Sequence, residues 1–154
     1  MPGISRILLA CLLAGMLPSC TGWPRGWMKA RTSAPADGLS GAWQGTWKSG
    51  RNGHHGRLRC AVFPSKDGKW EYRYRATWAG FFCAGFTVRC EAAPDGPGQW
   101  KVRGKKDLGP VFGGIFTHEA QVSGDNLRAT YSARMDHGVM ELRRVGAAGQ
   151  TGIP

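Results

Sequence analysis

Residues 70–78, WEYRYRATW, decide the fold of this chain. Aromatic or alanine residues occupy every second position, and charged or polar residues occupy the positions between them. A period of two is typical of a β-strand that has one face in a core and the other in water. We therefore expect Trp70, Tyr72, Tyr74 and Trp78 to point into a hydrophobic core.

The same alternation recurs on both sides of this segment, interrupted by turn sequences such as SKDG at 65–68. No stretch of ten residues has helical spacing. Because every connection is short, consecutive strands should pair as antiparallel hairpins, and closure into a barrel removes the exposed edges of an open sheet. The expected fold class is all-β, an eight-stranded antiparallel up-and-down meander that closes into a small barrel. The predicted strands are 42–49, 57–64, 69–78, 81–92, 99–104, 113–123, 126–134 and 138–145.

The strand register follows from keeping inward residues opposite inward residues, because a slip of one residue would expose the aromatic side chains. This register places Cys60, Cys83 and Cys90 further apart than the ~7 Å between Cα atoms that a disulfide tolerates. We therefore expect free thiols, with Cys60 and Cys90 as small core residues. The expected pairs are Cys60 with Tyr74, Val62 with Tyr72, Tyr74 with Phe86 and Ala76 with Ala84.

The composition indicates one small folded domain with a basic surface. The 154 residues carry a net charge of +11, and 42% of them are hydrophobic, which excludes the composition of a disordered chain. The 24 glycines follow no three-residue period, so a collagen helix is excluded. No apolar run reaches the ~18 residues that a membrane-spanning helix needs.

The N-terminus has the layout of an export signal. A lone Arg6 precedes an apolar run over 7–17, and the run ends in LPSC at 17–20. This pattern resembles the bacterial lipoprotein signal with its lipobox. The resemblance implies removal of residues 1–19, diacylglycerol on the Cys20 sulfur and a fatty acid such as palmitate on its amine. Thr21 follows the cysteine where inner-membrane lipoproteins have Asp, so the resemblance favours the outer membrane over the inner one.

Residues 20–38 are then the lipid anchor and a flexible tether, residues 39–145 the β-barrel domain, and residues 146–154 a disordered tail. The tether is rich in Pro, Gly and basic residues. Its Trp23 and Trp27 leave two interpretations open. The segment lies on the membrane surface, or it is a spacer whose tryptophans pack on the domain.

Two Gly-x-Trp units, which end at Trp43 and Trp47, open the first predicted strand. This pattern at the start of an eight-strand meander resembles the calycins, which include the lipocalins and avidin-like barrels. The resemblance implies that one of these tryptophans closes the barrel against Arg143 or Arg144 of the last strand. The stretches NGHHGRLR and DHGVMELRR also resemble planctomycete-type envelope lipoproteins, a resemblance that implies no activity.

Candidate chemistry is sparse. His54 and His55 are weak metal candidates, with His118 or His137 as a third ligand, but adjacent side chains point apart. We expect these loop histidines to form hydrogen bonds at the barrel rim, and we expect no metal or cofactor. The residues show no catalytic triad or other convergent polar set, so we do not expect an enzyme.

Four arginines should share the outer face of two paired strands: Arg57, Arg59, Arg73 and Arg75. They are called the basic face below. Anionic lipid and acidic polysaccharide are the candidate partners of such a surface on an exported protein. Nucleic acid is not expected, and the sequence does not indicate an oligomeric state.

Two functions fit these features. The first is a lipid-anchored module that binds a small apolar ligand inside the barrel. The second is a structural or interaction protein of the cell envelope with a filled barrel. A cavity of ~300 Å³ or more would favour the first. The residues expected to line the ligand site are Trp70, Tyr72, Tyr74, Trp78, Phe86 and Tyr131.

Overall fold

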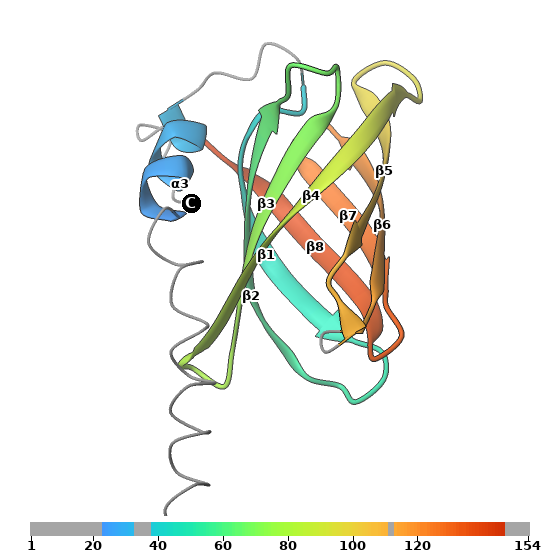
Figure 1. The fold of residues 1–154 in the computed structure, drawn as a ribbon. Coiled ribbons are helices and arrows are strands. Elements are labelled where there is room, and N and C mark those ends of the chain that lie inside the picture. The colour runs from blue at the N-terminus through green and yellow to red at the C-terminus, as the bar shows by residue number, and fades with distance from the viewer. Residues whose placement is uncertain (1–22, 33–37, 111–112, 147–154) are drawn as a thin grey trace, which may run out of the picture.

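Eight β-strands form a closed antiparallel barrel in sequence order (Figure 1). The structure, a computed structural model, describes residues 23–32, 38–110 and 113–146. The predicted meander barrel is confirmed, and one α-helix of the described residues, α3 (Trp23–Thr32), precedes it. The strands are β1 (Gly41–Ser49), β2 (His55–Pro64), β3 (Trp70–Trp78), β4 (Phe82–Pro94), β5 (Gln99–Asp107), β6 (Ile115–Ser123), β7 (Asn126–Ser132) and β8 (His137–Val145).

The strand register agrees with the one expected from the inward residues. Cys60 lies opposite Tyr74 between β2 and β3, and Tyr74 lies opposite Phe86 between β3 and β4. The other two expected pairs are also present. β8 returns beside β1 and closes the barrel, which places Arg144 opposite Trp43.

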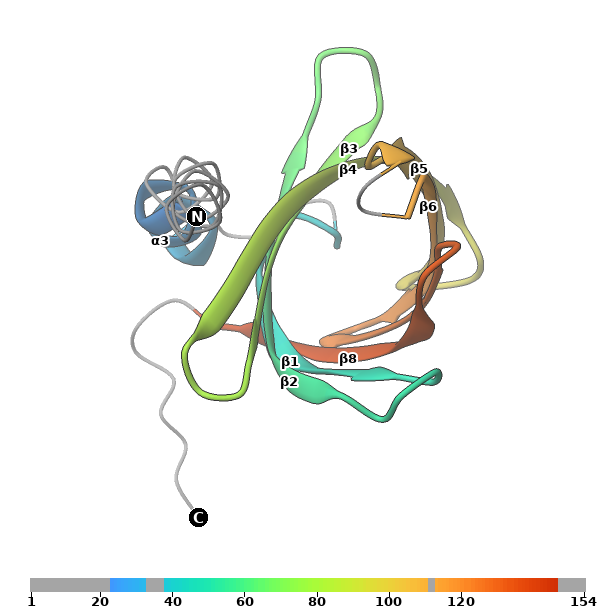
Figure 2. The ribbon, with the colours of Figure 1, turned by 60° about the horizontal axis from the view of Figure 1, so that its bottom comes forward.

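The barrel wall parts between β4 and β5. β4 pairs with β3 from Phe82 to Cys90, but it pairs with β5 only from Cys90 to Pro94. Gly104 of β5, opposite Cys90, forms the last β4–β5 pair before the strands separate. The two strands lie close at this point, since a Cβ on Gly104 would lie 2.5 Å from Sγ of Cys90. Beyond it β5 continues to Asp107, past its predicted end, with only β6 as partner. The β3–β4 hairpin consequently projects beyond the barrel rim (Figures 1 and 2).

Residues 23–32 form helix α3, although the sequence predicts no helix there, and that prediction is wrong. The helix signals are weak, because no acidic residue begins the segment and Gly26 lies within it. Trp23 and Trp27 are nevertheless four residues apart, which places them on one helix face. Their rings stack with centroids 5.8 Å apart. Packing, rather than intrinsic propensity, therefore stabilises α3.

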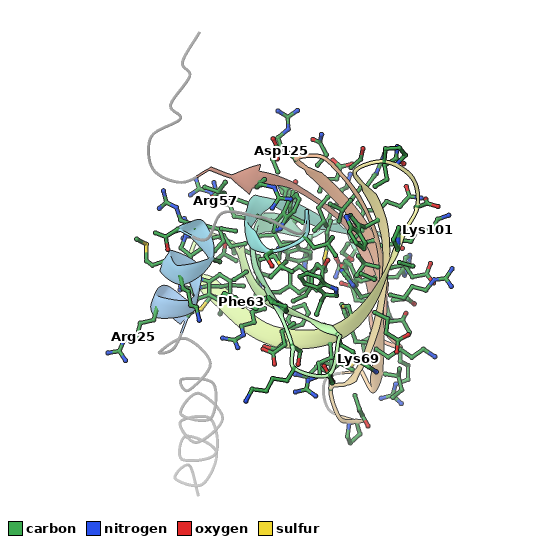
Figure 3. The ribbon with its side chains drawn as sticks, turned by 90° about the horizontal axis from the view of Figure 1, so that it is seen from above. Arg25, Arg57, Phe63, Lys69, Lys101 and Asp125 are labelled. Carbon is green, nitrogen blue, oxygen red and sulfur yellow. The ribbon has the colours of Figure 1, made fainter. Side chains whose placement is uncertain are left out.

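Helix α3 sits on two small residues that point away from the barrel interior. Ala42 of β1 pairs with Ala61 of β2, and both are buried because Trp27 and Ala30 cover them. Phe63 lies between α3 and the barrel (Figure 3). Of the two interpretations of the tether, this contact supports the packing of its tryptophans on the domain.

The expected signal peptide, Cys20 and the end of the tail lie outside the described residues. Both hydrophobic clusters of the described residues lie between Trp23 and Val145. A chain that begins at residue 21 therefore keeps the whole of this core and is expected to fold. Within the described part of the chain, no helix has the length and apolar character needed to cross a membrane.

Candidate functional site

The aromatic residues predicted to line a ligand pocket pack against one another inside the barrel. Tyr72 and Tyr74 are fully buried, and Tyr74 stacks on Phe86 with ring centroids 5.3 Å apart. Phe86 meets Phe116 of β6 at 5.2 Å, and Phe116 stacks on Tyr131 of β7 at 5.9 Å. These rings extend from β3 to β7, and side chains occupy the barrel interior in Figure 3.

A chain of buried polar groups lies beside these rings. The Tyr74 hydroxyl is 2.6 Å from Nε2 of His118, and Nδ1 of His118 is 3.6 Å from Sγ of Cys90. Burial lowers the pKa of His118 to about 4 and raises the pKa of the Cys90 thiol to about 12. Cys60, Cys83 and Cys90 form no disulfide with one another. The contacts among Tyr74, His118 and Cys90 satisfy buried polar atoms. Because its pKa is raised, the Cys90 thiol stays protonated at neutral pH and is not a thiolate nucleophile.

The histidines considered as weak metal candidates do not come together in the structure. His54 and His55 are exposed at the end of the β1–β2 loop and the start of β2, where Nδ1 of His55 lies 3.2 Å from the carbonyl oxygen of Gly53. His118 lies in the core. Within the described ranges, no group of three His, Cys, Asp or Glu side chains is placed to hold a metal ion. The signal that could have located His118 is its inward position in the alternation of β6.

One end of the barrel is closed by Trp43 and Arg144. The Arg144 guanidinium carbon lies 4.1 Å from the centroid of the fully buried Trp43 ring. Arg144 also donates hydrogen bonds to the backbone oxygens of Ser40 and Gly38, each at 2.6 Å. Nε1 of Trp43 donates to the Leu39 oxygen at 3.1 Å. The segment before β1 is thus held at this end, called the closed end below.

Two residues predicted to take part in this closure lie elsewhere. Arg143 is exposed, because its place in the alternation of β8 points outward. Trp47 is half-buried, donates to the Thr77 oxygen at 3.3 Å and meets the Trp78 ring edge-on at 6.4 Å. Trp47 therefore belongs to the opposite end of the barrel.

The opposite end carries a group of three rings on the β3–β4 hairpin, defined here as the aromatic tip: the half-buried Trp78 and the exposed Phe81 and Phe82. Phe81 is 77% exposed and Phe82 is 47% exposed, although their rings lie 4.2 Å apart. Phe82 also stacks on Trp78 at 5.7 Å. The alternation points Phe82 inward, but the hairpin has left the barrel at this position. Among the other predicted ligand-site residues, Trp70 is half-buried against the core.

The Tyr131 hydroxyl forms a hydrogen bond with the loop that precedes β8. It donates to Oδ2 of Asp136 at 2.9 Å, and the Ser49 hydroxyl donates to Oδ1 at 2.5 Å. Burial and the neighbouring carboxylate raise the pKa of Tyr131. This network joins the end of β1 to the turn before β8, so it stabilises this part of the barrel.

The basic face divides into engaged and unengaged arginines. Arg59 lies over the Trp27 ring at 5.3 Å, and Arg73 lies over the Phe63 ring at 5.0 Å. Arg73 also pairs with Glu71 at 2.7 Å. Arg57, Arg59 and Arg75 have no ion pair among the described residues, so Arg59 is engaged by a ring alone. Arg59 and Arg75 are direct cross-strand neighbours.

A hollow of about 570 Å³ follows this part of the basic face and reaches the aromatic tip. Arg57, Arg59 and Arg75 line it together with Trp78 and Gly80. Three guanidinium groups and an aromatic ring therefore border one open depression.

A second hollow, of about 710 Å³, lies over Gly104 and has a different electrostatic character. Three of its four cations are paired: Lys69 lies 3.1 Å from Glu91, Arg89 lies 3.6 Å from Asp67 and Arg103 lies 3.6 Å from Glu119. The hollow beside the aromatic tip is thus the more strongly cationic of the two. The chain matches no protein-family model, no curated protein and no solved structure.

Proposed function

We propose that this protein is an exported, non-enzymatic β-barrel of the cell envelope whose outer surface binds anionic lipid or acidic polysaccharide. The observation that carries the proposal is the set of Arg57, Arg59 and Arg75, which share one face without an ion pair among the described residues. Like charges directly opposite each other on a sheet are destabilising. An anionic partner would relieve the repulsion between Arg59 and Arg75.

The packing of the barrel supports an outer rather than an inner binding site. Trp43, Tyr72, Tyr74 and His118 are each at most 1% exposed, so large side chains occupy the interior. Protein interiors packed in this way leave few voids larger than a water molecule. A filled barrel with a cationic exterior fits an interaction protein better than a carrier.

Binding to an acidic polymer tests this proposal. A chain that begins at residue 21 should bind polygalacturonate or vesicles that contain phosphatidylglycerol, and added salt should weaken the binding by screening. The double variant Arg57→Ala with Arg75→Ala should bind at least tenfold more weakly.

The matched control for this test removes the same charge from the other side of the barrel. Lys101 and Arg103 of β5 each have a carboxylate partner, and Lys101 lies opposite Arg57 across the barrel (Figure 3). Their double alanine variant should bind within about twofold of the parent, because these sites lie beyond the ~8 Å Debye length from the basic face. Equal losses in the two double variants would contradict the proposal.

The lipid anchor at Cys20 is part of the same proposal and rests on the LPSC sequence at 17–20. A fatty-acid label fed to cells should attach to the protein, and Cys20→Ser should remove the label. Fractionation should place the labelled protein in the outer membrane. A label that persists in the Cys20→Ser variant would exclude this anchor.

A second candidate function, binding of an apolar acid, is favoured by Lys106. This half-buried lysine lies where β4 and β5 part, in a hollow of about 510 Å³ that Tyr74 and Phe86 also line. A ligand carboxylate would pair with Lys106 and its apolar chain would contact the rings. Native mass spectrometry of protein from its own host would reveal such a ligand. Lys106→Ala should release a fluorescent fatty acid, whereas Lys105→Ala, on the outer face, should not.

A further inference from the structure

The aromatic tip and the cationic hollow form one continuous surface. Arg57 and Arg75 line the hollow with Trp78 and with Ala79 and Gly80 of the hairpin turn. Phe81 and Phe82 follow that turn in the sequence, and their side chains are exposed to water. Cations are therefore placed beside the most exposed rings on the described surface.

We propose that this surface docks onto an anionic lipid bilayer, with the aromatic tip inserted at the interface. The inference rests on the proposed function and names the bilayer as its partner. Arg57, Arg59 and Arg75 would contact lipid phosphates, for which the planar guanidinium fork is suited. Phe81 and Phe82 would leave water for the acyl boundary, and Trp78 would lie at headgroup depth.

The exposed rings select a bilayer over a polysaccharide. Phe81 and Phe82 lie on a hairpin that projects beyond the barrel, so the hydrophobic core does not cover their rings. Burial of such apolar surface in the acyl region is favourable, whereas a hydrated acidic polymer provides no comparable apolar phase. A polymer would use the arginines and leave the rings in water.

The position of α3 agrees with this orientation. The first turn of α3, at Trp23, points toward the end of the barrel from which the hairpin projects (Figure 1). Cys20 precedes Trp23 by three residues, a reach of at most about 11 Å. An acyl chain on Cys20 and the aromatic tip would therefore engage the same bilayer and hold the barrel in one orientation.

Sedimentation with vesicles tests the inference on a chain that begins at residue 21, which lacks Cys20. The chain should bind vesicles of phosphatidylcholine with phosphatidylglycerol and bind poorly to phosphatidylcholine alone. Phe81→Ser with Phe82→Ser should weaken vesicle binding about tenfold or more. The same change should leave polygalacturonate binding within about twofold. Arg57→Ala with Arg75→Ala should weaken vesicle binding by about 25-fold, at about fivefold for each arginine.

Ile115→Ser is the matched control for the ring variants. Ile115 is 56% exposed and begins β6, on the other side of the barrel from the hairpin. This variant should bind vesicles like the parent chain, and unfolding by urea should show that every variant is folded.

The outcomes separate the inference from the proposed function. Arginine-dependent binding to polygalacturonate without binding to vesicles would overturn the bilayer inference alone. Vesicle binding that is insensitive to Phe81 and Phe82 would also overturn it. Failure to bind either the polymer or the vesicles would remove the proposed function as well.

Discussion

The two ends of the barrel differ in the solvent exposure of their large aromatic side chains. At the closed end Trp43 is fully buried, beneath Arg144 and beside the segment before β1. At the hairpin end Phe81 and Phe82 are exposed. Both ends belong to one meander with one alternation pattern. The difference therefore arises from what the rest of the chain places over each end.

This contrast separates stability from binding. The closed end combines apolar burial with hydrogen bonds from Trp43 and Arg144 to backbone oxygens of the segment before β1. The hairpin end leaves apolar rings in water, which costs free energy unless a partner covers them. Substitutions at the closed end should therefore change unfolding, and substitutions at the hairpin end should change binding.

The largest expected effect is that of Trp43→Ala. Removal of a fully buried indole should lower the free energy of unfolding by about 3–5 kcal/mol. Trp47→Ala should cost about 1–2 kcal/mol because this indole is only half-buried. Phe81→Ser should change stability by less than about 0.5 kcal/mol. Urea unfolding followed by circular dichroism measures all three, and equal losses for Trp43→Ala and Phe81→Ser would break the comparison.

The next largest effect is a loss of stability in acid, caused by His118 in the core between the two ends. The pKa of His118 is about 4 in the folded protein, because burial disfavours its charged form, against 6.5 for an exposed histidine. As pH falls below 6.5 the unfolded chain binds the proton first. Stability should then fall by about 3 kcal/mol until the pH passes the folded-state pKa.

The variant His118→Gln isolates this contribution. Loss of the hydrogen bond to Tyr74 should lower its stability at neutral pH, but its unfolding free energy should lose most of the slope between pH 6.5 and 4. The double variant His54→Gln with His55→Gln, in an exposed loop, should keep the slope of the parent. An unchanged slope in His118→Gln would show that other groups cause the acid sensitivity.

The smallest effect distinguishes two neighbouring arginines. Arg144→Ala removes two hydrogen bonds to backbone oxygens and the contact over Trp43, and should cost about 2 kcal/mol. Arg143→Ala removes an exposed side chain and should cost less than about 0.5 kcal/mol. Thermal unfolding compares the two variants directly. A larger loss for Arg143→Ala would contradict the assignment of Arg144 to the closed end.

The fold was predictable because the alternation of apolar and polar residues within each strand shows which face is buried. The alternation in WEYRYRATW recurs along the chain, and short turns leave each strand only its sequence neighbour as a partner. The register was predictable as well, since a slip of one residue would turn Tyr72 and Tyr74 outward and the short turns exclude longer slips. The resemblances to calycins and to lipoprotein signals stay predictions.

The site was less predictable because exposure depends on where the barrel ends. Phe82 and Tyr74 have the same inward position in the alternation, yet one lies on a projecting hairpin and the other in the core. Sequence spacing likewise left open whether Trp43 or Trp47 meets an arginine, and whether that arginine is Arg143 or Arg144.

By itself, the sequence determined the strands, their order, the register and the basic outer face, because each depends on residues that are near one another in the chain. Tertiary structure alone decided three features. It seated α3 on Ala42 and Ala61, parted β4 from β5 at Gly104, and left the aromatic tip outside the barrel. Each depends on the space between residues distant in sequence, and alternation of polar and apolar residues along a strand carries no information about that space.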